Sequence, residues 1–311
     1  MIEFCGLQLA HPIVNGSGTF DAIAARRAFG EALLEGFPFS AFVSKTITVE
    51  ARAGNPPPRL WEAPAGMINS IGLPNRGLAG YLEHDLPQLA QLPVPLVTNV
   101  MGATEDEVAR LVEAVDARSE VAAIELNVSC PNLKTGLDIG ADAGSLASLV
   151  RTVRPLARKP LIVKLTPNTA DVAANAAAAE SEGADAVSLV NTLRATSLDP
   201  ADGGPWLGGC TGGLSGPAIR AVALAQVAAV ARAVAIPVVG MGGVACGRHA
   251  NDLISVGARL VAVGTENFRD PGAGKRIASE LKSLQIAQRP ATTSNRSEAR
   301  PEVDVNWRDS R

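Results

Sequence analysis

Residues 236–265 read IPVVGMGGVACGRHANDLISVGARLVAVGT and contain one complete unit of the fold. Two short apolar runs, 236–240 and 260–264, enclose a segment of helical length at 247–257. This order predicts two parallel strands joined by a helix, because parallel neighbours need a long crossover connection. Neither run alternates with polar residues, which indicates strands buried on both faces.

The same unit recurs along most of the chain. Apolar runs that predict strands occupy residues 12–15, 41–45, 95–100, 123–127, 161–165, 186–190, 236–240 and 260–264. Segments that predict helices occupy residues 21–35, 77–90, 104–117, 142–158, 169–182, 217–234, 247–257 and 272–285. Eight such units predict fold class α/β, as a single-domain (β/α)8 TIM barrel over residues 1–287 with long loops at its C-terminal face. An open doubly wound sheet is the alternative.

Three segments depart from this alternation. Residues 46–76 are rich in Pro, Gly and Asn and are longer than an ordinary connection from strand to helix. Residues 128–141 form a second long loop, and such loops at the C-terminal face of a barrel commonly act as lids or substrate walls. Residues 288–311 lack apolar periodicity and are expected to form a disordered C-terminal tail.

Composition excludes several classes of protein. The chain has a net charge of −3 and only 4% aromatic residues, so it lacks the basic field and the stacking surfaces of nucleic-acid-binding proteins. No basic segment followed by a long apolar run opens the chain, which predicts a cytoplasmic protein with no signal peptide and no membrane span. The four cysteines are far apart in sequence, so we expect neither a disulfide framework nor a protein-built metal site.

Polar side chains or glycines follow nearly every predicted strand. In a barrel, the carboxyl ends of the strands meet at one face, where active sites form. The residues at these ends are Asn15, Gly16, Ser17, Ser44, Lys45, Thr46, Thr98, Asn99, Asn127, Lys164, Asn191, Thr192, Gly242, Gly243, Gly264 and Thr265. The set predicts a binding site for a planar ligand rich in hydrogen-bond donors and acceptors.

Gly242 and Gly243 follow the seventh predicted strand, and Gly264 and Thr265 follow the eighth. Barrels commonly bind a phosphate there, on backbone N–H groups and a helix N-terminus. We interpret these residues as the phosphate site of a mononucleotide. Ordinary tight turns are the alternative explanation of the glycines.

Two lysines end apolar strands, Lys45 and Lys164. A lysine buried at such a position needs a counter-charge. We interpret the pair as partners of an anionic cofactor and an anionic substrate, and a structural ion pair for each is the alternative.

Cys130 lies in the segment LNVSCPN, residues 126–132, just past the fourth predicted strand. A lone cysteine is usually a small buried hydrophobe. On a loop beside a serine and several amides, however, its thiol is placed as a general base, since a modest pKa shift makes it a useful proton acceptor. Cys5, Cys210 and Cys246 are assigned structural roles.

Several longer motifs occur in order along the chain. They are Lys45-Thr-Ile-Thr48, Gly54-Asn-Pro-Pro-Pro-Arg59, Asn69-Ser-Ile-Gly-Leu-Pro-Asn75, the 127–132 segment, Gly212-Gly-Leu-Ser-Gly-Pro-Ala218 and Gly240-Met-Gly-Gly243. Through them the chain resembles the class 1 dihydroorotate dehydrogenases, and most of all the class 1B catalytic subunit, over about residues 6–287. Leu137 departs from the family, which commonly has glycine there, and so does the arginine-containing tail.

The resemblance implies that FMN binds in the barrel and that (S)-dihydroorotate is oxidised to orotate, in de novo pyrimidine (UMP) biosynthesis. Cys130 would remove the C5 proton while hydride passes from C6 to the flavin. The implied FMN-binding residues are Ser17, Lys45, Thr46, Asn99, Asn127, Lys164, Val190, Gly216, Gly242, Gly243, Gly264 and Thr265. The implied substrate-binding residues are Lys45, Asn69, Ser70, Ile71, Gly72, Leu73, Asn127, Asn191 and Thr192.

The resemblance also implies a route for the electrons. Four scattered cysteines do not supply the usual thiolates of an iron–sulfur cluster. Transfer to NAD would therefore use a partner subunit that carries FAD and an iron–sulfur cluster, around a homodimer core of a heterotetramer. The alternatives are a fumarate-dependent enzyme of class 1A type, a flavin enzyme like the dihydropyrimidine dehydrogenases, and a barrel that binds FMN or phosphate without catalysis.

Overall fold

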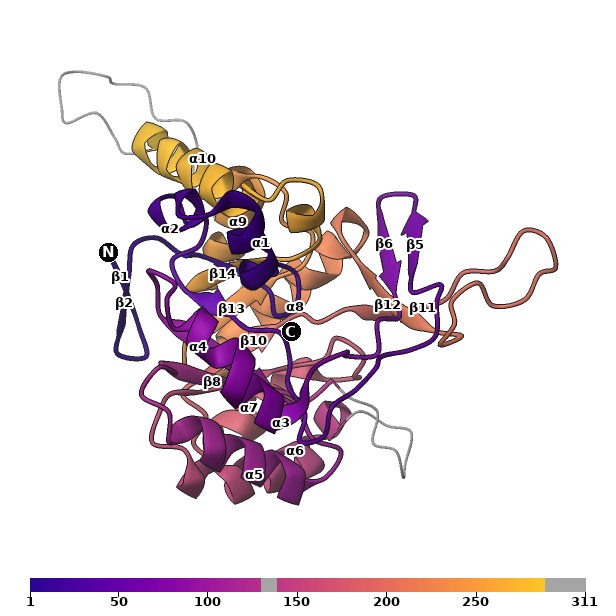
Figure 1. Ribbon diagram of the computed structural model, residues 1–311. Coiled ribbons are helices and arrows are strands. Elements are labelled where there is room, and N and C mark those ends of the chain that lie inside the picture. The colour runs from indigo at the N-terminus through magenta and orange to yellow at the C-terminus, as the bar shows by residue number, and fades with distance from the viewer. Residues whose placement is uncertain (130–138, 289–311) are drawn as a thin grey trace.

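The computed structural model describes residues 1–129 and 139–288, and its centre is an eight-stranded parallel sheet wrapped by helices (Figure 1). In spatial order the strands are β3 (Ile13–Asn15), β14 (Leu260–Val263), β13 (Val238–Met241), β10 (Ala186–Leu189), β9 (Leu161–Lys164), β8 (Ala123–Asn127), β7 (Leu96–Val100) and β4 (Phe42–Val43). All eight predicted strands are therefore confirmed. Around the sheet, each strand lies next to the barrel strands that precede and follow it in the chain, as in a barrel. The strand order shows no reversal of the kind that a doubly wound sheet requires.

The barrel closes between β3 and β4 through a side chain. The Asn15 amide nitrogen donates to the Val43 carbonyl at 2.8 Å, and its oxygen accepts from the Val43 N–H at 2.8 Å. Next to this pair, the Ser40 N–H donates to the Ile13 carbonyl at 3.0 Å. Asn15 is completely buried, so its amide takes the place of a backbone ladder at the last seam. The open sheet considered as an alternative is thereby excluded.

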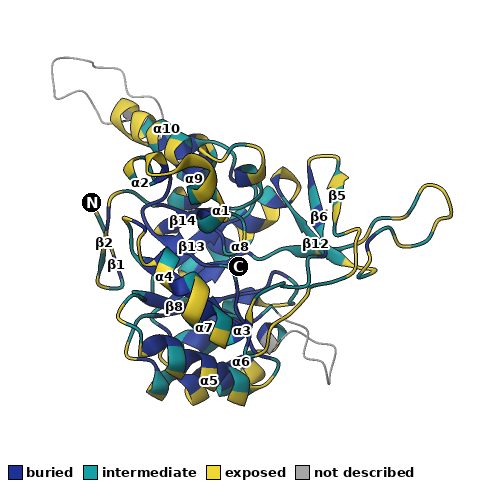
Figure 2. Cartoon of the chain, viewed as in Figure 1, coloured by how far each residue is buried: buried dark blue, intermediate teal, exposed yellow. Residues whose placement is uncertain are grey.

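Helices cover the outside of the sheet, each with one face buried against it (Figure 2). They are α1 (Ala22–Phe29), α2 (Ala32–Glu35), α3 (Gly77–Gly80), α4 (Leu86–Leu89), α5 (Glu105–Asp116), α6 (Ala143–Val153), α7 (Val172–Ser181), α8 (Arg220–Ala233), α9 (Gly247–Ser255) and α10 (Ala273–Gln288). A π-helical stretch, Tyr81–Asp85, joins α3 to α4. Each predicted helical segment contains at least one of these elements.

Local chemistry explains two helix ends. Thr104 caps α5 by accepting the Glu107 N–H, whereas the Glu107 carboxylate accepts from Ala103. The arrangement resembles a capping box, except that the glutamate accepts from the residue before the cap rather than from the cap itself. The α-helical part of segment 142–158 ends at Val153 and continues as a 3₁₀ turn, because Pro155 has no N–H to donate.

The interior of the barrel changes from apolar to polar along its axis. Its N-terminal half is filled by side chains such as Val97 and Ile162, and the hairpin of β1 (Ile2–Phe4) and β2 (Leu7–Leu9) closes that end with Phe4 and Leu9. Nearer the C-terminal end, buried polar groups follow on the same strands: Asn99, Glu125, Lys164 and Ser188. We call this C-terminal end the mouth of the barrel.

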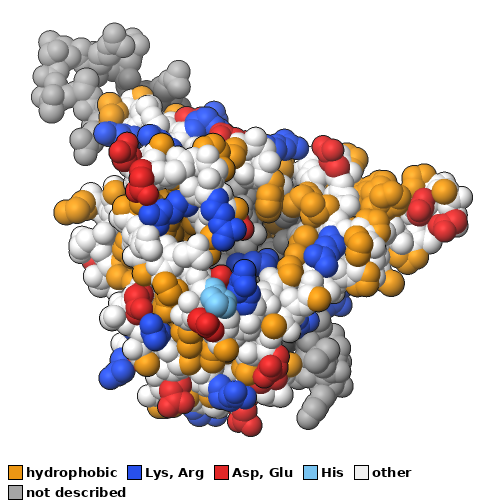
Figure 3. All heavy atoms as spheres, viewed as in Figure 1, with side chains coloured by type: hydrophobic (Ala, Val, Ile, Leu, Met, Phe, Trp, Pro, Cys, Tyr) orange, Lys and Arg blue, Asp and Glu red, His pale blue; other side chains and the backbone are white. Residues whose placement is uncertain are grey.

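A second sheet stands beside the mouth and was not predicted. It contains β11 (Leu193–Ala195), β12 (Gly212–Ser215), β6 (Gly66–Asn69) and β5 (Leu60–Ala63) in antiparallel order, and we call it the antiparallel arm. Part of segment 46–76, expected to be a loop, is therefore a hairpin. Figure 3 shows hydrophobic side chains gathered on the arm. Trp61 of β5 and Trp206, in the connection between β11 and β12, meet edge to face with their ring centroids 5.2 Å apart.

Candidate active site

Polar side chains from four strand ends touch one another across the mouth. The Ser17 hydroxyl, after β3, lies 3.4 Å from the Thr46 hydroxyl, after β4. The Asn127 amide at the end of β8 donates to Thr46 at 3.5 Å, and Asn191, after β10, donates to Asn127 at 3.5 Å. The structure therefore brings together four of the predicted site residues that are far apart in the sequence.

A second polar layer lies just below. Glu125 of β8 accepts from the Asn99 amide at 2.5 Å and from the Ser188 hydroxyl at 2.8 Å. The remaining amide oxygen of Asn99 is buried and has no hydrogen-bond partner within the described residues. Asn99 was predicted, whereas Glu125 and Ser188 were not, because they lie inside apolar runs rather than at the ends. A buried amide oxygen without a partner can accept a hydrogen bond from a ligand.

Both predicted lysines lie at the mouth. Lys164 ends β9 and is 6% exposed, and Lys45 follows β4. Burial lowers the pKa of Lys45, and the charge of Asp21 opposes that shift in part. Among residues 1–129 and 139–288, no ion pair joins either lysine to a carboxylate. The geometry thus favours an anionic ligand over a structural ion pair.

The loops that follow β13 and β14 enclose a small pocket, which we call the glycine pocket. Its lining residues are Gly66, Gly216, Pro217, Gly243, Val244, Ala245, Thr265, Glu266 and Arg269. Gly216, Gly243 and Thr265, three of the residues predicted to bind FMN, therefore line one hollow. Backbone N–H groups in glycine-rich turns of this kind commonly bind phosphate groups.

The backbone at two of these glycines requires glycine. Gly242 and Gly243 have φ values of +123° and +69°, and a Cβ at Gly243 would lie 2.7 Å from the Cβ of Arg220. The side chain of Val190, another predicted residue, packs 3.1 Å from the Cβ position of Gly242. The turn explanation is therefore correct for both glycines, and it is compatible with phosphate binding because the same turn forms the wall of the pocket.

The antiparallel arm carries the predicted substrate segment to the mouth. Asn69 ends β6, pairs with Gly213 of β12 and donates to its carbonyl at 3.1 Å. The neighbouring strand, β11, begins directly after Asn191 and Thr192. Residues 69–73 therefore begin at the end of one strand of the arm, and residues 191–192 directly precede another, although the two segments are separated by more than 100 positions. Ser70 is buried, and its hydroxyl already donates to Thr211 at 2.8 Å.

Cys130 lies outside the described residues. The preceding residue, Ser129, donates its N–H to the Asn127 side chain at 3.2 Å, so the chain leaves the described part at the mouth. Of the three cysteines that are described, Cys5 lies at the opposite end of the barrel. Burial, together with Asp185 and Glu3, raises the pKa of its thiol to about 12, as befits an unreactive side chain.

Comparison with known proteins agrees with this geometry. The family model for dihydroorotate dehydrogenase matches residues 1–284. The chain belongs to the dihydroorotate dehydrogenase family. The resemblance inferred from the motifs is therefore confirmed.

Relatives within the dihydroorotate dehydrogenase family match almost end to end. A protein of Desulforudis audaxviator is 44% identical over 291 residues, 92% of each chain. Proteins of Geobacter sulfurreducens and Bacillus pumilus are each 42% identical, over 90% and 92% of this chain and 91% of their own lengths. All three are named dihydroorotate dehydrogenase B (NAD(+)), catalytic subunit. Within the described part of this chain, no helix is both long and apolar enough to cross a membrane.

Proposed function

We propose that residues 1–287 form the FMN-binding catalytic subunit of an NAD-linked dihydroorotate dehydrogenase, which oxidises (S)-dihydroorotate to orotate in cytoplasmic pyrimidine biosynthesis. The observation that carries the proposal is the mouth itself. Amides and hydroxyls from four strand ends adjoin two lysines without carboxylate partners and lie at the same end of the barrel as the glycine pocket. Together these groups match a ligand with a phosphate, polar ring edges and a bound anion.

The residues present fit FMN. Backbone N–H groups of Gly243, Gly264 and Thr265, with Gly216 and Gly242 shaping the turns, would hold its phosphate. The unpartnered oxygen of Asn99 and the ammonium of Lys164 would face the polar edge of its ring, and Ser17, Thr46, Asn127 and Val190 would enclose the rest. FMN, when bound, supplies the acceptor for the hydride from C6 of the substrate.

The substrate would lie against the same mouth. Lys45 would bind its carboxylate, while the Asn127 and Asn191 amides would bind the ring amides, whose alternating donors and acceptors they match. Residues 69–73 and Thr192, carried on the antiparallel arm, would form the other wall. We assign Cys130 as the base that removes the C5 proton.

The electrons would leave through a second protein. The relatives' names describe a catalytic subunit linked to NAD, which implies a separate electron-transfer subunit. We propose that this partner carries FAD and an iron–sulfur cluster and binds a homodimer of the present chain. A fumarate-using enzyme, a dihydropyrimidine dehydrogenase and a non-catalytic barrel are disfavoured by these names.

Steady-state assays on the purified single chain test the proposal. We expect dihydroorotate oxidation with an artificial dye acceptor and negligible reduction of NAD until the electron-transfer subunit is added. Rapid turnover of the single chain with NAD or with fumarate would contradict the partner-dependent route, and no oxidation with any acceptor would contradict the activity.

A further inference from the structure

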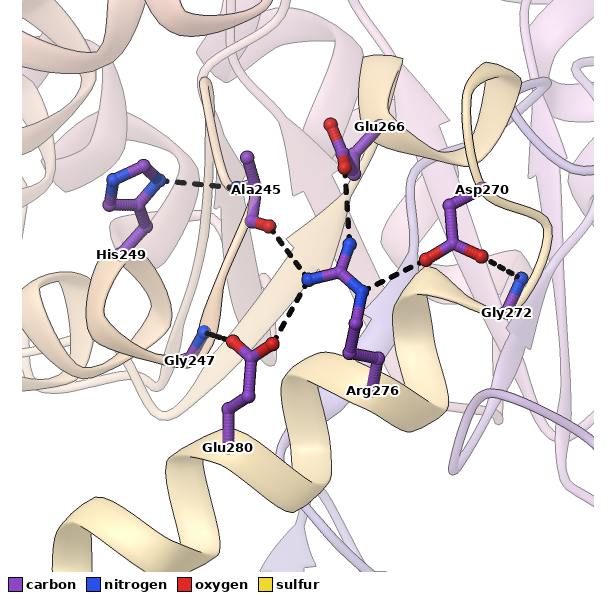
Figure 4. Close-up of polar contacts among 8 residues, drawn as sticks. All are labelled: Ala245, Gly247, His249, Glu266, Asp270, Gly272, Arg276 and Glu280. Carbon is purple, nitrogen blue, oxygen red and sulfur yellow. Dashed lines mark hydrogen bonds and ion pairs between the residues drawn. The ribbon is translucent and has the colours of Figure 1, made fainter.

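Behind the glycine pocket, one arginine joins the two loops that form it. Arg276 lies on α10, outside the barrel, and is not one of the residues that line the pocket. One of its terminal nitrogens donates to the Ala245 carbonyl at 3.1 Å, and the other donates to the Glu266 carboxylate at 3.1 Å (Figure 4). Ala245 follows β13 and Glu266 follows β14, and both line the pocket.

Other contacts fix the arginine and both loops. Its Nε donates to Asp270 at 2.9 Å, and Glu280 accepts from Arg276 at 3.1 Å and from the Gly247 N–H at 2.6 Å. On the far side of the first loop, the His249 ring accepts the Ala245 N–H at 3.3 Å. The planar guanidinium thus has its donors directed at four acceptors, an arrangement that the single ammonium of a lysine does not reproduce.

The contact with Arg276 also changes the charge that a phosphate in the glycine pocket would meet. The charged residues that line the pocket are Glu266 and Arg269, so without further compensation a phosphate would lie near a carboxylate. Two anions at short range repel, and the repulsion is strong where water is partly excluded. The ion pair with Arg276, which also pairs with Asp270 and Glu280, offsets part of the charge of Glu266 and turns its carboxylate toward α10.

We propose that Arg276 is a positioning residue for the phosphate of the cofactor. It holds the loops after β13 and β14 at the spacing of the pocket and offsets part of the charge of Glu266, without contacting the phosphate itself. The proposal rests on FMN being the ligand, as proposed above. The proposal predicts a selective effect: loss of the arginine should weaken the binding of a flavin that has a phosphate and should not weaken the binding of one that lacks it.

The test compares FMN with riboflavin, which has the same ring and ribityl chain and no phosphate. The full chain is stripped of flavin and titrated with each, with flavin fluorescence as the signal. For Arg276→Gln we expect the ratio of FMN affinity to riboflavin affinity to fall roughly tenfold or more, since hydrogen bonds to charged groups are involved. Riboflavin affinity itself should stay unchanged.

Two further variants separate charge from fold. Arg151→Gln is the matched control, because Arg151 forms a similar two-point ion pair with Glu182, on helices that do not line the pocket, and its loss should leave the ratio unchanged. In the double variant Arg276→Gln with Glu266→Gln, the ratio should recover in part, because the carboxylate that lines the pocket is then absent, whereas Asp270 and Glu280 do not line it. Equal losses for both flavins, or an unchanged ratio in Arg276→Gln, would overturn the proposal.

If Arg276→Gln does not fold, two milder variants test the role of Arg276 instead. Arg276→Lys keeps the positive charge but loses the several directed N–H donors of the guanidinium. It should lower the ratio of FMN to riboflavin affinity by a smaller factor than Arg276→Gln, whereas Glu266→Gln alone should not lower this ratio. The opposite results would overturn the role of Arg276. A wild-type chain that does not prefer FMN to riboflavin would instead refute FMN as the cofactor, so the two failures are distinguishable.

Discussion

Lys164 places a positive charge inside the barrel, where charges are rare. Its side chain is buried at the end of β9, beside a polar layer of Asn99, Glu125 and Ser188. Glu125 already accepts two hydrogen bonds, and within the described ranges it forms no ion pair with Lys164. A buried ammonium of this kind is stabilised when a ligand supplies negative charge, as the reduced flavin ring does.

Replacement of Lys164 tests this role. Lys164→Ala should weaken FMN binding by about tenfold or more, because a hydrogen bond from a charged group contributes about 1.5–3 kcal/mol. It should also lower the midpoint potential of the bound flavin, since the reduced anion loses its cation. Flavin titration and redox titration measure the two effects. Lys159→Ala is the control, because Lys159 lies just before β9 and its ammonium donates to the Arg118 carbonyl, away from the mouth. Unchanged FMN affinity and midpoint potential in both variants would refute the assignment of Lys164.

Cys130 is the assigned base, and its replacement should affect the chemistry without affecting FMN. Cys130→Ala should bind FMN normally and should slow flavin reduction by dihydroorotate by roughly 10²–10⁴, the usual contribution of a positioned general base. Cys130→Ser should be slow near neutral pH and faster at high pH, because a hydroxyl loses its proton less readily than a thiol. Stopped-flow flavin absorbance measures both.

Cys5→Ala is the matched control for thiol loss. The Cys5 thiol has a pKa of about 12 and lies at the closed end of the barrel. Its removal should leave the rate of flavin reduction unchanged. A rate near that of the wild type in Cys130→Ala would refute the base assignment.

Residues at strand ends were predictable, and residues within strands were not. Thr46, Asn127 and Asn191 interrupt apolar runs at their carboxyl ends, and barrel geometry alone brings such ends together. The sequence does not identify Glu125 as a site residue, because a single acid inside an apolar run indicates neither its hydrogen-bond partners nor its position along the barrel axis. Arg276 gives none either, since its contacts depend on how α10 packs across two loops.

At the scale of elements, Asp116 fastens the N-terminal end of β9. It ends α5, and its carboxylate accepts the N–H groups of Arg158 and Lys159 at 2.8 and 2.9 Å and the Arg158 Nε at 3.1 Å. Burial alone would raise the pKa of Asp116, but these hydrogen bonds outweigh it and lower the pKa below its ordinary value of 3.8. The carboxylate therefore contributes stability above that pH, and the contribution is lost as the pH falls through and below 3.8.

Asp116→Ala should lower the free energy of unfolding by about 1–3 kcal/mol at pH 7, because two backbone N–H groups lose a charged acceptor. The difference from the wild type should shrink as the pH falls below about 4, where the wild-type carboxylate becomes protonated. Urea unfolding at several pH values measures this. Asp106→Ala, an exposed acid in the first turn of the same helix, should cost only a few tenths of a kcal/mol. A pH-independent difference for Asp116→Ala would contradict the account.

The antiparallel arm shows what periodicity cannot predict. Its strand β12 reads GGLS, and its pairing partner β6 lies more than 140 positions earlier in the chain. Glycine has low strand propensity, and short strands of this kind become stable only through pairing with distant neighbours. The eight barrel strands were predictable because each is a continuous apolar run with buried faces.

At the scale of the whole molecule, residues 1–129 and 139–288 form one barrel with one arm. The barrel holds the strand ends that would bind the cofactor, and residues 69–73 and 192 lie at or next to the strand ends of the arm. This division explains why the predicted site residues come from almost every part of the chain. It also places the proposed substrate wall next to strand ends of a sheet that is separate from the barrel sheet.

The central claim is that this barrel oxidises dihydroorotate through bound FMN. The most direct measurement is anaerobic mixing of the purified, FMN-loaded chain with dihydroorotate while the absorbance of the flavin is recorded. The account predicts rapid bleaching by dihydroorotate and little by dihydrouracil, which lacks the carboxylate that Lys45 would bind. Flavin that stays oxidised with dihydroorotate, or bleaches equally with dihydrouracil, would contradict it.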